Sequence, residues 1–175
     1  MVVSDLELKD YLGNKEFIKA MQNISKYSED RKVLVDKANE IGEEIGVGSP
    51  EYKKAHEDVV HFEPPYTEGE MFAILAYQNA IAFRPSILTF FGDLYPETVK
   101  DFTSMFDKLG VKQFVYTPTC LPGEEPVYGE TSIDTLTILC KNGWNINGMA
   151  EYIDQHLGTD YYGKGFNIVR EQKGE

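Results

Sequence analysis

The chain has 175 residues, of which 42% are hydrophobic, and its 29 acidic residues against 17 basic ones leave a net charge of -12 at pH 7. This size and apolar content exclude global disorder and suit one folded domain with a helical extension. No apolar run approaches the ~20 residues of a membrane span. The first residues lack the basic region and apolar run of a signal peptide, so we expect a cytoplasmic protein with no membrane partner.

The first 62 residues have the pattern of several helices. Asn14 is placed to begin a helix through residue 27, and Ser28 to begin another whose apolar residues recur at three- and four-residue steps. Ser49, followed by proline, begins a further helix, because proline in the first turn removes no hydrogen bond that the helix needs. The sequence therefore predicts a helical region over residues 1–62.

Residues 63–85 are predicted to form a hinge and one buried helix. Glu63 is followed by two prolines, which favour a rigid, non-helical connection. Thr67 and Glu70 form a capping box, in which each side chain can satisfy the other residue's backbone N–H group. The helix that follows, to about residue 83, is apolar on nearly all faces, which indicates a central position.

After residue 85 the pattern changes to short β-branched and aromatic runs separated by helices. Thr131 or Ser132 is expected to cap the second of these helices, and Gly163 and Gly165 are expected to form a turn before the last strand. The predicted strands are 86–91, 111–117, 144–153 and 166–171, and the predicted helices are 96–109 and 132–142. The fold class is therefore α+β, an N-terminal helical region followed by a β-α-β-α-β-β mixed-sheet domain over residues 86–175. The unit at 86–117 should be parallel, and the last two strands should pair as a hairpin.

Residues that could carry chemistry are few. The sequence has no nucleophile elbow and no phosphate-binding loop, and its histidines have no metal-ligand spacing. Cys120 and Cys140 lack the CxxC spacing of a redox or zinc site. Cys120 is the one candidate nucleophile, since it follows a predicted strand, but the neighbouring acids disfavour its thiolate. We therefore expect no catalytic residue, no metal and no cofactor.

The most informative feature is an acidic stretch between residues 114 and 163. It holds seven acids against a single base, Lys141. Such a field repels the phosphates of nucleic acids and favours a basic protein surface, so we expect no direct binding of nucleic acid. The predicted partner-binding residues are Glu124, Glu125, Glu130, Asp134, Glu151, Asp154 and Asp160.

The C-terminal half resembles the tail of GNAT acetyltransferases. The resemblance covers residues 86–171 and depends on the element order and on the run C-K-N-G-W-N-I-N-G-M before the last two strands. It implies a coenzyme A site at a Q/R-x-x-G-x-G/A loop. Here that loop is Phe91-Gly-Asp-Leu-Tyr-Pro, with one glycine and an aspartate that would repel pyrophosphate. A GNAT-like acyltransferase with a degenerate cofactor loop is therefore the alternative function.

The size, the charge and the acidic stretch resemble those of small accessory proteins of phages and other mobile elements, including anti-CRISPR and antirestriction proteins. Some of these act as DNA mimics, presenting carboxylates where phosphates would lie. The predicted function is a non-enzymatic, acidic protein-binding inhibitor that blocks a basic, nucleic-acid-handling host protein such as an RNA-guided nuclease. A second alternative is a helical adaptor, whose N-terminal helices pair with a partner or with a second copy as a homo-oligomer.

Overall fold

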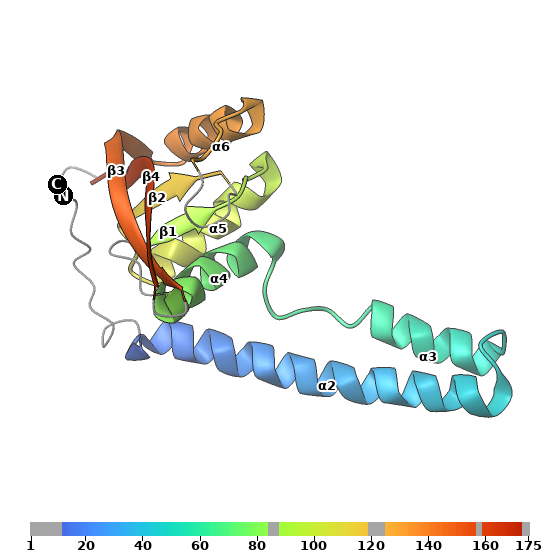
Figure 1. Cartoon of the computed structure of the whole chain (residues 1–175). Coiled ribbons are helices and arrows are strands. Elements are labelled where there is room, and N and C mark those ends of the chain that lie inside the picture. Colours follow the sequence, from blue (N-terminus) through green and yellow to red (C-terminus); the bar gives the residue numbers. More distant parts are fainter. Residues whose placement is uncertain (1–11, 84–87, 119–124, 157–158, 173–175) are drawn as a thin grey trace. The chain divides into compact units, whose positions relative to one another are not determined.

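The computed structural model describes residues 12–83, 88–118, 125–156 and 159–172 (Figure 1). Across these residues it contains five helices and a four-stranded mixed sheet, which confirms the α+β class. The chain divides into two compact units. One comprises residues 18–66, and the other comprises residues 1–17 together with 67–175.

Two helices form the first unit, and their predicted starts are confirmed. Helix α2 spans Lys15–Ile45 and helix α3 spans Pro50–Val60. The Asn14 side chain accepts the backbone N–H of Phe17 at 3.1 Å, and the Ser49 hydroxyl accepts that of Tyr52 at 3.1 Å. Each cap satisfies a donor at the end of a helix that has no partner within the helix.

The helix start predicted at Ser28 is wrong, because α2 continues through it. An ion pair between Lys26 and Asp30, 2.6 Å long and one helical turn apart, spans the expected break. Tyr27, Leu34 and Ile41 also keep a seven-residue spacing across it. A serine followed by acids is a local signal for a helix start. Here it is overridden, because the side chains at seven-residue spacing form a continuous row on one side of the helix.

Helix α4 (Glu68–Phe83) begins at the predicted capping box. The Thr67 backbone N–H donates to the Glu70 carboxylate at 3.2 Å, and the Glu70 N–H donates to the Thr67 hydroxyl at 3.4 Å. The side chains of Ile74 and Tyr77 are fully buried, which confirms the expected central position. This helix belongs to the same compact unit as the sheet.

The sheet has the strand order β1-β2-β4-β3. Strands β1 and β2 are parallel and joined through helix α5, whereas β4 is antiparallel to both of its neighbours, as predicted for a parallel unit and a terminal hairpin. The bounds of these elements are β1 Thr89–Phe91, α5 Pro96–Lys108, β2 Gln113–Thr117, β3 Trp144–His156 and β4 Thr159–Arg170.

Helix α5 and helix α6 (Glu130–Lys141) lie on one face of the sheet, where the aromatic core is found (Figure 1). The ring centroids of Phe106 and Phe114 are 5.2 Å apart, and those of Phe114 and Trp144 are also 5.2 Å apart. Both pairs are edge-to-face, an arrangement that aromatic rings prefer over direct stacking. These contacts join α5 to β2 and to the start of β3.

Strand β4 begins seven residues before its predicted start, and Gly163 and Gly165 lie inside it rather than in a turn. Tyr152 of β3 is paired with Gly163, and its ring occupies the space that a Cβ atom on Gly163 would take. A Cβ atom on Gly165 would lie 2.5 Å from Val115 of β2. The glycines therefore let the buried Tyr152 ring lie across β4 and reach Phe91 of β1, 6.2 Å away between centroids.

Candidate functional site

The carboxyl ends of parallel strands are the usual ligand-binding edge of an α/β sheet. At this edge the Tyr116 hydroxyl donates to the Asp93 carboxylate at 3.0 Å, and burial raises the pKa of Tyr116 to about 12. The Leu94 N–H donates to the Thr135 hydroxyl at 3.1 Å, which in turn donates to the Thr131 carbonyl at 3.0 Å. These groups satisfy one another and tie the loop after β1 to helix α6.

The same loop does not fit coenzyme A. A pyrophosphate needs free backbone N–H groups at the start of the helix that follows the strand. Here Asp93 supplies a negative charge, the Leu94 N–H is already hydrogen-bonded inside the protein, and Pro96 has no N–H. Strands β1 and β2 also remain paired as far as Phe91 and Thr117.

Helix α6, which carries two of the predicted acids, starts earlier than expected. Helix α6 begins at Glu130 with Gly129 as its N-cap, so the expected caps at Thr131 and Ser132 are wrong. Ser132 is buried instead, on the side of α6 that faces the Tyr116 hydroxyl. Tertiary packing against β2 therefore sets where the first turn lies.

Three of the predicted partner-binding acids lie around the start of α6, and a fourth falls outside the described residues. Glu125 is exposed in the segment before the helix, Glu130 is the first helical residue, and Asp134 is exposed one turn later. Glu124 lies outside the described residues, as does Cys120. Acidic side chains near a helix N-terminus are also stabilised by the helix dipole.

The other three acids lie on the β3–β4 ribbon. Glu151 and Asp160 are exposed and share one face of the ribbon, since Glu151 pairs with Lys164, and Gln155, four residues further on the same face, pairs with Asp160. The backbone of Asp154 pairs with that of Tyr161, and the Asp154 side chain lies outside the described ones. The structure therefore describes the side chains of five of the seven predicted acids, three around the start of α6 and two on the ribbon.

Few acids of the described residues lie in ion pairs. Asp30 and Asp36 of α2 are paired with lysines, and Asp107 is paired with Arg170. None of the described acids Glu125, Glu130, Asp134, Glu151 and Asp160 lies in an ion pair, although Lys164 is the cross-strand neighbour of Glu151. These five acids are set apart by their sequence neighbourhood, because residues 114–163 contain a single base, Lys141.

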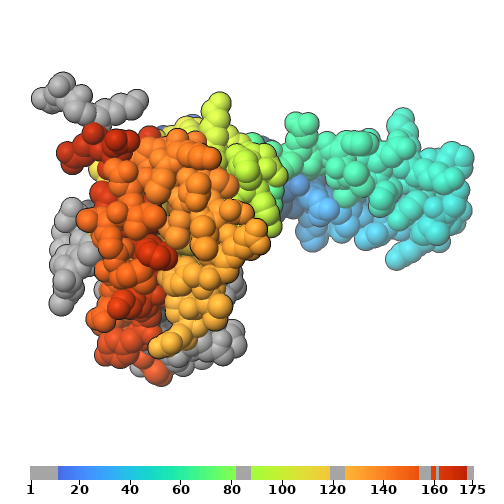
Figure 2. Space-filling model, turned by 90° about the horizontal axis from the view of Figure 1, so that it is seen from above, coloured from blue at the N-terminus to red at the C-terminus, as the bar shows by residue number. Residues whose placement is uncertain are grey.

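An apolar surface beside these acids was missed at the level of sequence. Ile133 of α6 is 58% exposed, and Ile146 and Met149 of β3 are 43% and 44% exposed. Figure 2 shows the atoms of α6 and β3 adjoining on one side of this unit. The sequence did hold a signal for this surface, since Ile133 and Cys140 are seven residues apart and therefore lie on the same side of α6.

The described residues contain no group of three histidine, cysteine, aspartate or glutamate side chains that could hold a metal ion. None of the helices in these residues is long and apolar enough to cross a membrane.

Comparison of the chain with protein-family models, with curated proteins and with solved structures found no match.

Proposed function

We propose that this protein is a non-enzymatic, acidic binding module that docks a positively charged, nucleic-acid-handling protein. The surface involved is the acidic face, defined as Glu125, Glu130, Asp134, Glu151 and Asp160. The observation that carries the proposal is that these five acids are exposed and unpaired within the described part of the chain, in a stretch, residues 114–163, whose single base is Lys141.

Charge complementarity explains why the partner would be basic. Exposed carboxylates without counter-charges repel one another. A partner surface of arginines and lysines offsets this repulsion, because each basic side chain attracts the carboxylates that it faces. Proteins that hold nucleic acids carry such surfaces to bind phosphates. The specific form of the proposal is an inhibitor from a phage or mobile element that covers the phosphate-binding surface of a host nuclease.

The test compares two triple charge reversals that change the net charge equally. One carries Glu125→Lys, Glu130→Lys and Asp134→Lys on the acidic face. The matched control carries Glu40→Lys, Glu43→Lys and Glu44→Lys on the exposed surface of α2. The immobilised proteins are incubated with a bacterial lysate, and the retained proteins are identified by mass spectrometry and then measured by equilibrium titration.

We expect the acidic-face variant to bind the retained partner about ten-fold or more weakly, and the α2 variant to bind within about two-fold of wild type. Duplex DNA should compete for the partner. Affinity should fall as salt shortens the Debye length from about 8 Å to about 3 Å. Equal binding by both variants, or a retained partner that does not bind nucleic acid, would refute the proposal.

A further inference from the structure

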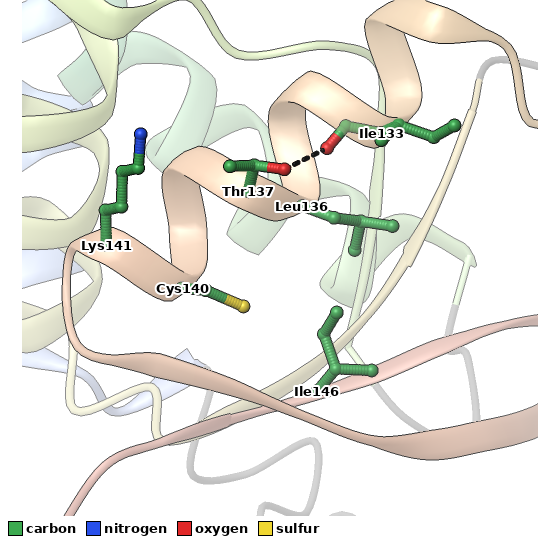
Figure 3. Close-up of a pocket in the computed structure, with 6 residues that line it drawn as sticks. All are labelled: Ile133, Leu136, Thr137, Cys140, Lys141 and Ile146. Atoms are coloured by element: carbon green, nitrogen blue, oxygen red, sulfur yellow. Dashed lines mark hydrogen bonds between the residues drawn. The ribbon is translucent and has the colours of Figure 1, made fainter.

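Helix α6 and strand β3 enclose an open apolar groove of about 490 Å³ (Figure 3). Leu136 and Cys140 point from the helix toward Ile146 on the strand, and these three side chains form its floor. The remaining lining residues are Ile133, Thr137 and Lys141.

Helix α6 has a buried side and, next to it, an exposed apolar side. Ser132, Thr135 and Leu139 are buried, and the Thr135 hydroxyl is hydrogen-bonded within the protein. Ile133 and Cys140 are exposed and lie two turns apart on the same side of the helix. The buried side is enough to pack α6 on the sheet, so the exposed apolar side is available to a partner.

A bulge in β3 adds a further apolar side chain on the same face. Ile146 pairs with Ile168, and Met149 pairs with Phe166, so a register shift lies between Ile146 and Met149. Without it, residues three apart in a strand would point to opposite faces. Gly148 supplies the positive φ of +72° within the bulge. Bulges of this kind re-aim side chains next to functional surfaces.

The same bulge argues for a helical rather than an extended occupant. Strand β3 pairs only with β4 among the described residues, so it forms an edge of the sheet. An added strand would need an unbroken row of backbone groups along that edge, and the bulge interrupts this row beside the groove. A helix needs no such row, since it docks through side chains spaced three and four residues apart.

The charge around the groove defines the occupant further. Glu130 and Asp134 lie along the outer side of α6, and Glu151 belongs to the same face of β3 as Ile146 and Met149. Two bases are also present, since Lys141 lines the groove near the end of α6 and Lys164 is the cross-strand neighbour of Glu151. The charge beside the groove is thus negative at the start of α6, at Glu130 and Asp134, and the floor is apolar.

We propose that the α6–β3 groove binds a basic amphipathic helix of the partner protein. Apolar side chains of this helix at positions i, i+4 and i+7 would lie on Leu136, Cys140 and Ile146, and its lysines or arginines would face Glu130 and Asp134. This inference rests on the proposed function and names the segment that the acidic face receives.

The probe is a synthetic helical peptide of about 18 residues with a leucine stripe at this spacing and lysines on its other faces. Two further peptides replace the leucines by alanine or the lysines by glutamate. Binding is followed by fluorescence anisotropy of the labelled peptide. A second readout is alkylation of the Cys140 thiol, which is exposed in the groove, in a protein that carries Cys120→Ser.

We expect the leucine–lysine peptide to bind and to slow Cys140 alkylation, and both altered peptides to bind at least about ten-fold more weakly. Ile133→Ser should weaken peptide binding about ten-fold. Val127→Ser, at an 84% exposed position outside the groove lining, should leave binding within about two-fold of wild type. Unchanged fluorescence of the buried Trp144 shows that each variant is folded.

The outcomes separate this inference from the proposed function. If the alanine peptide binds as tightly as the leucine peptide, or Cys140 is not protected, the groove does not receive the helix and the inference is wrong. Charge-dependent binding of the peptides would still support the acidic face in that case. Absence of any peptide binding, or dimerisation of this chain that Ile133→Ser abolishes, also overturns the inference.

Discussion

Gly69 offers a direct test of how closely helices α4 and α5 pack. It is buried in the first turn of α4, and a Cβ atom there would overlap the Thr98 carbonyl oxygen and lie 3.0 Å from the Phe102 backbone nitrogen. These are backbone atoms of α5, which cannot rotate away as the end of a side chain can. The substitution Gly69→Ala therefore forces the two helices apart.

The expected effect is the difference between two opposing contributions. Alanine favours a helix over glycine by at most ~1 kcal/mol, so a loosely packed interface would make the variant more stable. Overpacking typically costs 1–3 kcal/mol, and separating the helices also disturbs Ile74 and Tyr77, which are fully buried on α4. We expect a net destabilisation of about 1–2 kcal/mol, which lowers Tm by about 2–8 °C in a protein of this size.

The assay is urea and thermal unfolding followed by the fluorescence of Trp144, the single tryptophan, which is fully buried beside the sheet. Gly48→Ala is the control, because no atom lies within 4 Å of its Cβ position. Both changes restrict the unfolded chain similarly. If Gly69→Ala is as stable as Gly48→Ala, the close approach of α4 and α5 is wrong.

Three further predictions concern other contacts of the sheet unit. Burial raises the pKa of Tyr116 to about 12, so the stability that the neutral phenol contributes is present below pH 10 and is lost as the pH rises from about 10 to 12. Over that range the free energy of unfolding, measured with urea, should fall by about 2–3 kcal/mol more for wild type than for Tyr116→Phe. Arg170 donates to the Asn142 carbonyl at 2.8 Å and to the Asp107 carboxylate at 3.0 Å. Arg170→Lys cannot make both bonds and should lower the unfolding free energy by about 1–2 kcal/mol, whereas a change below about 0.5 kcal/mol would contradict this role. Calorimetric titration with acetyl-coenzyme A should show no binding with a dissociation constant below about 1 mM. The reason is that Asp93, hydrogen-bonded to Tyr116, lies in the loop where a GNAT enzyme would hold the pyrophosphate. A smaller dissociation constant would restore the acyltransferase hypothesis.

Several elements could be predicted from the sequence because their signals are local. The caps at Asn14, Ser49 and Thr67 act within three residues, and each is present in the structure. The change to short β-branched runs after residue 85 likewise predicted the strands and the parallel unit. Such signals depend only on neighbours in the chain, so tertiary structure had little to add.

The candidate site was only partly predictable. The number of acids in a stretch of sequence does not say on which face of a helix or strand each acid lies. The sequence indicated the acidic stretch, and the structure places Glu125, Glu130 and Asp134 around α6. The register shift between Ile146 and Met149 puts these two side chains on one face, together with Glu151. No local pattern in the sequence indicates this shift.

By itself, then, the sequence determined the fold class, most helix ends and the acidic character of the C-terminal half. Only the tertiary structure decided that α2 runs unbroken through Ser28, that Gly163 lies under the Tyr152 ring, and that Ile133 and Ile146 border one groove. Each of these features depends on packing beyond the local signal, and the last two join residues more than ten apart in the chain. Their energies come from strand pairing and side-chain burial, which exist only once distant segments have met.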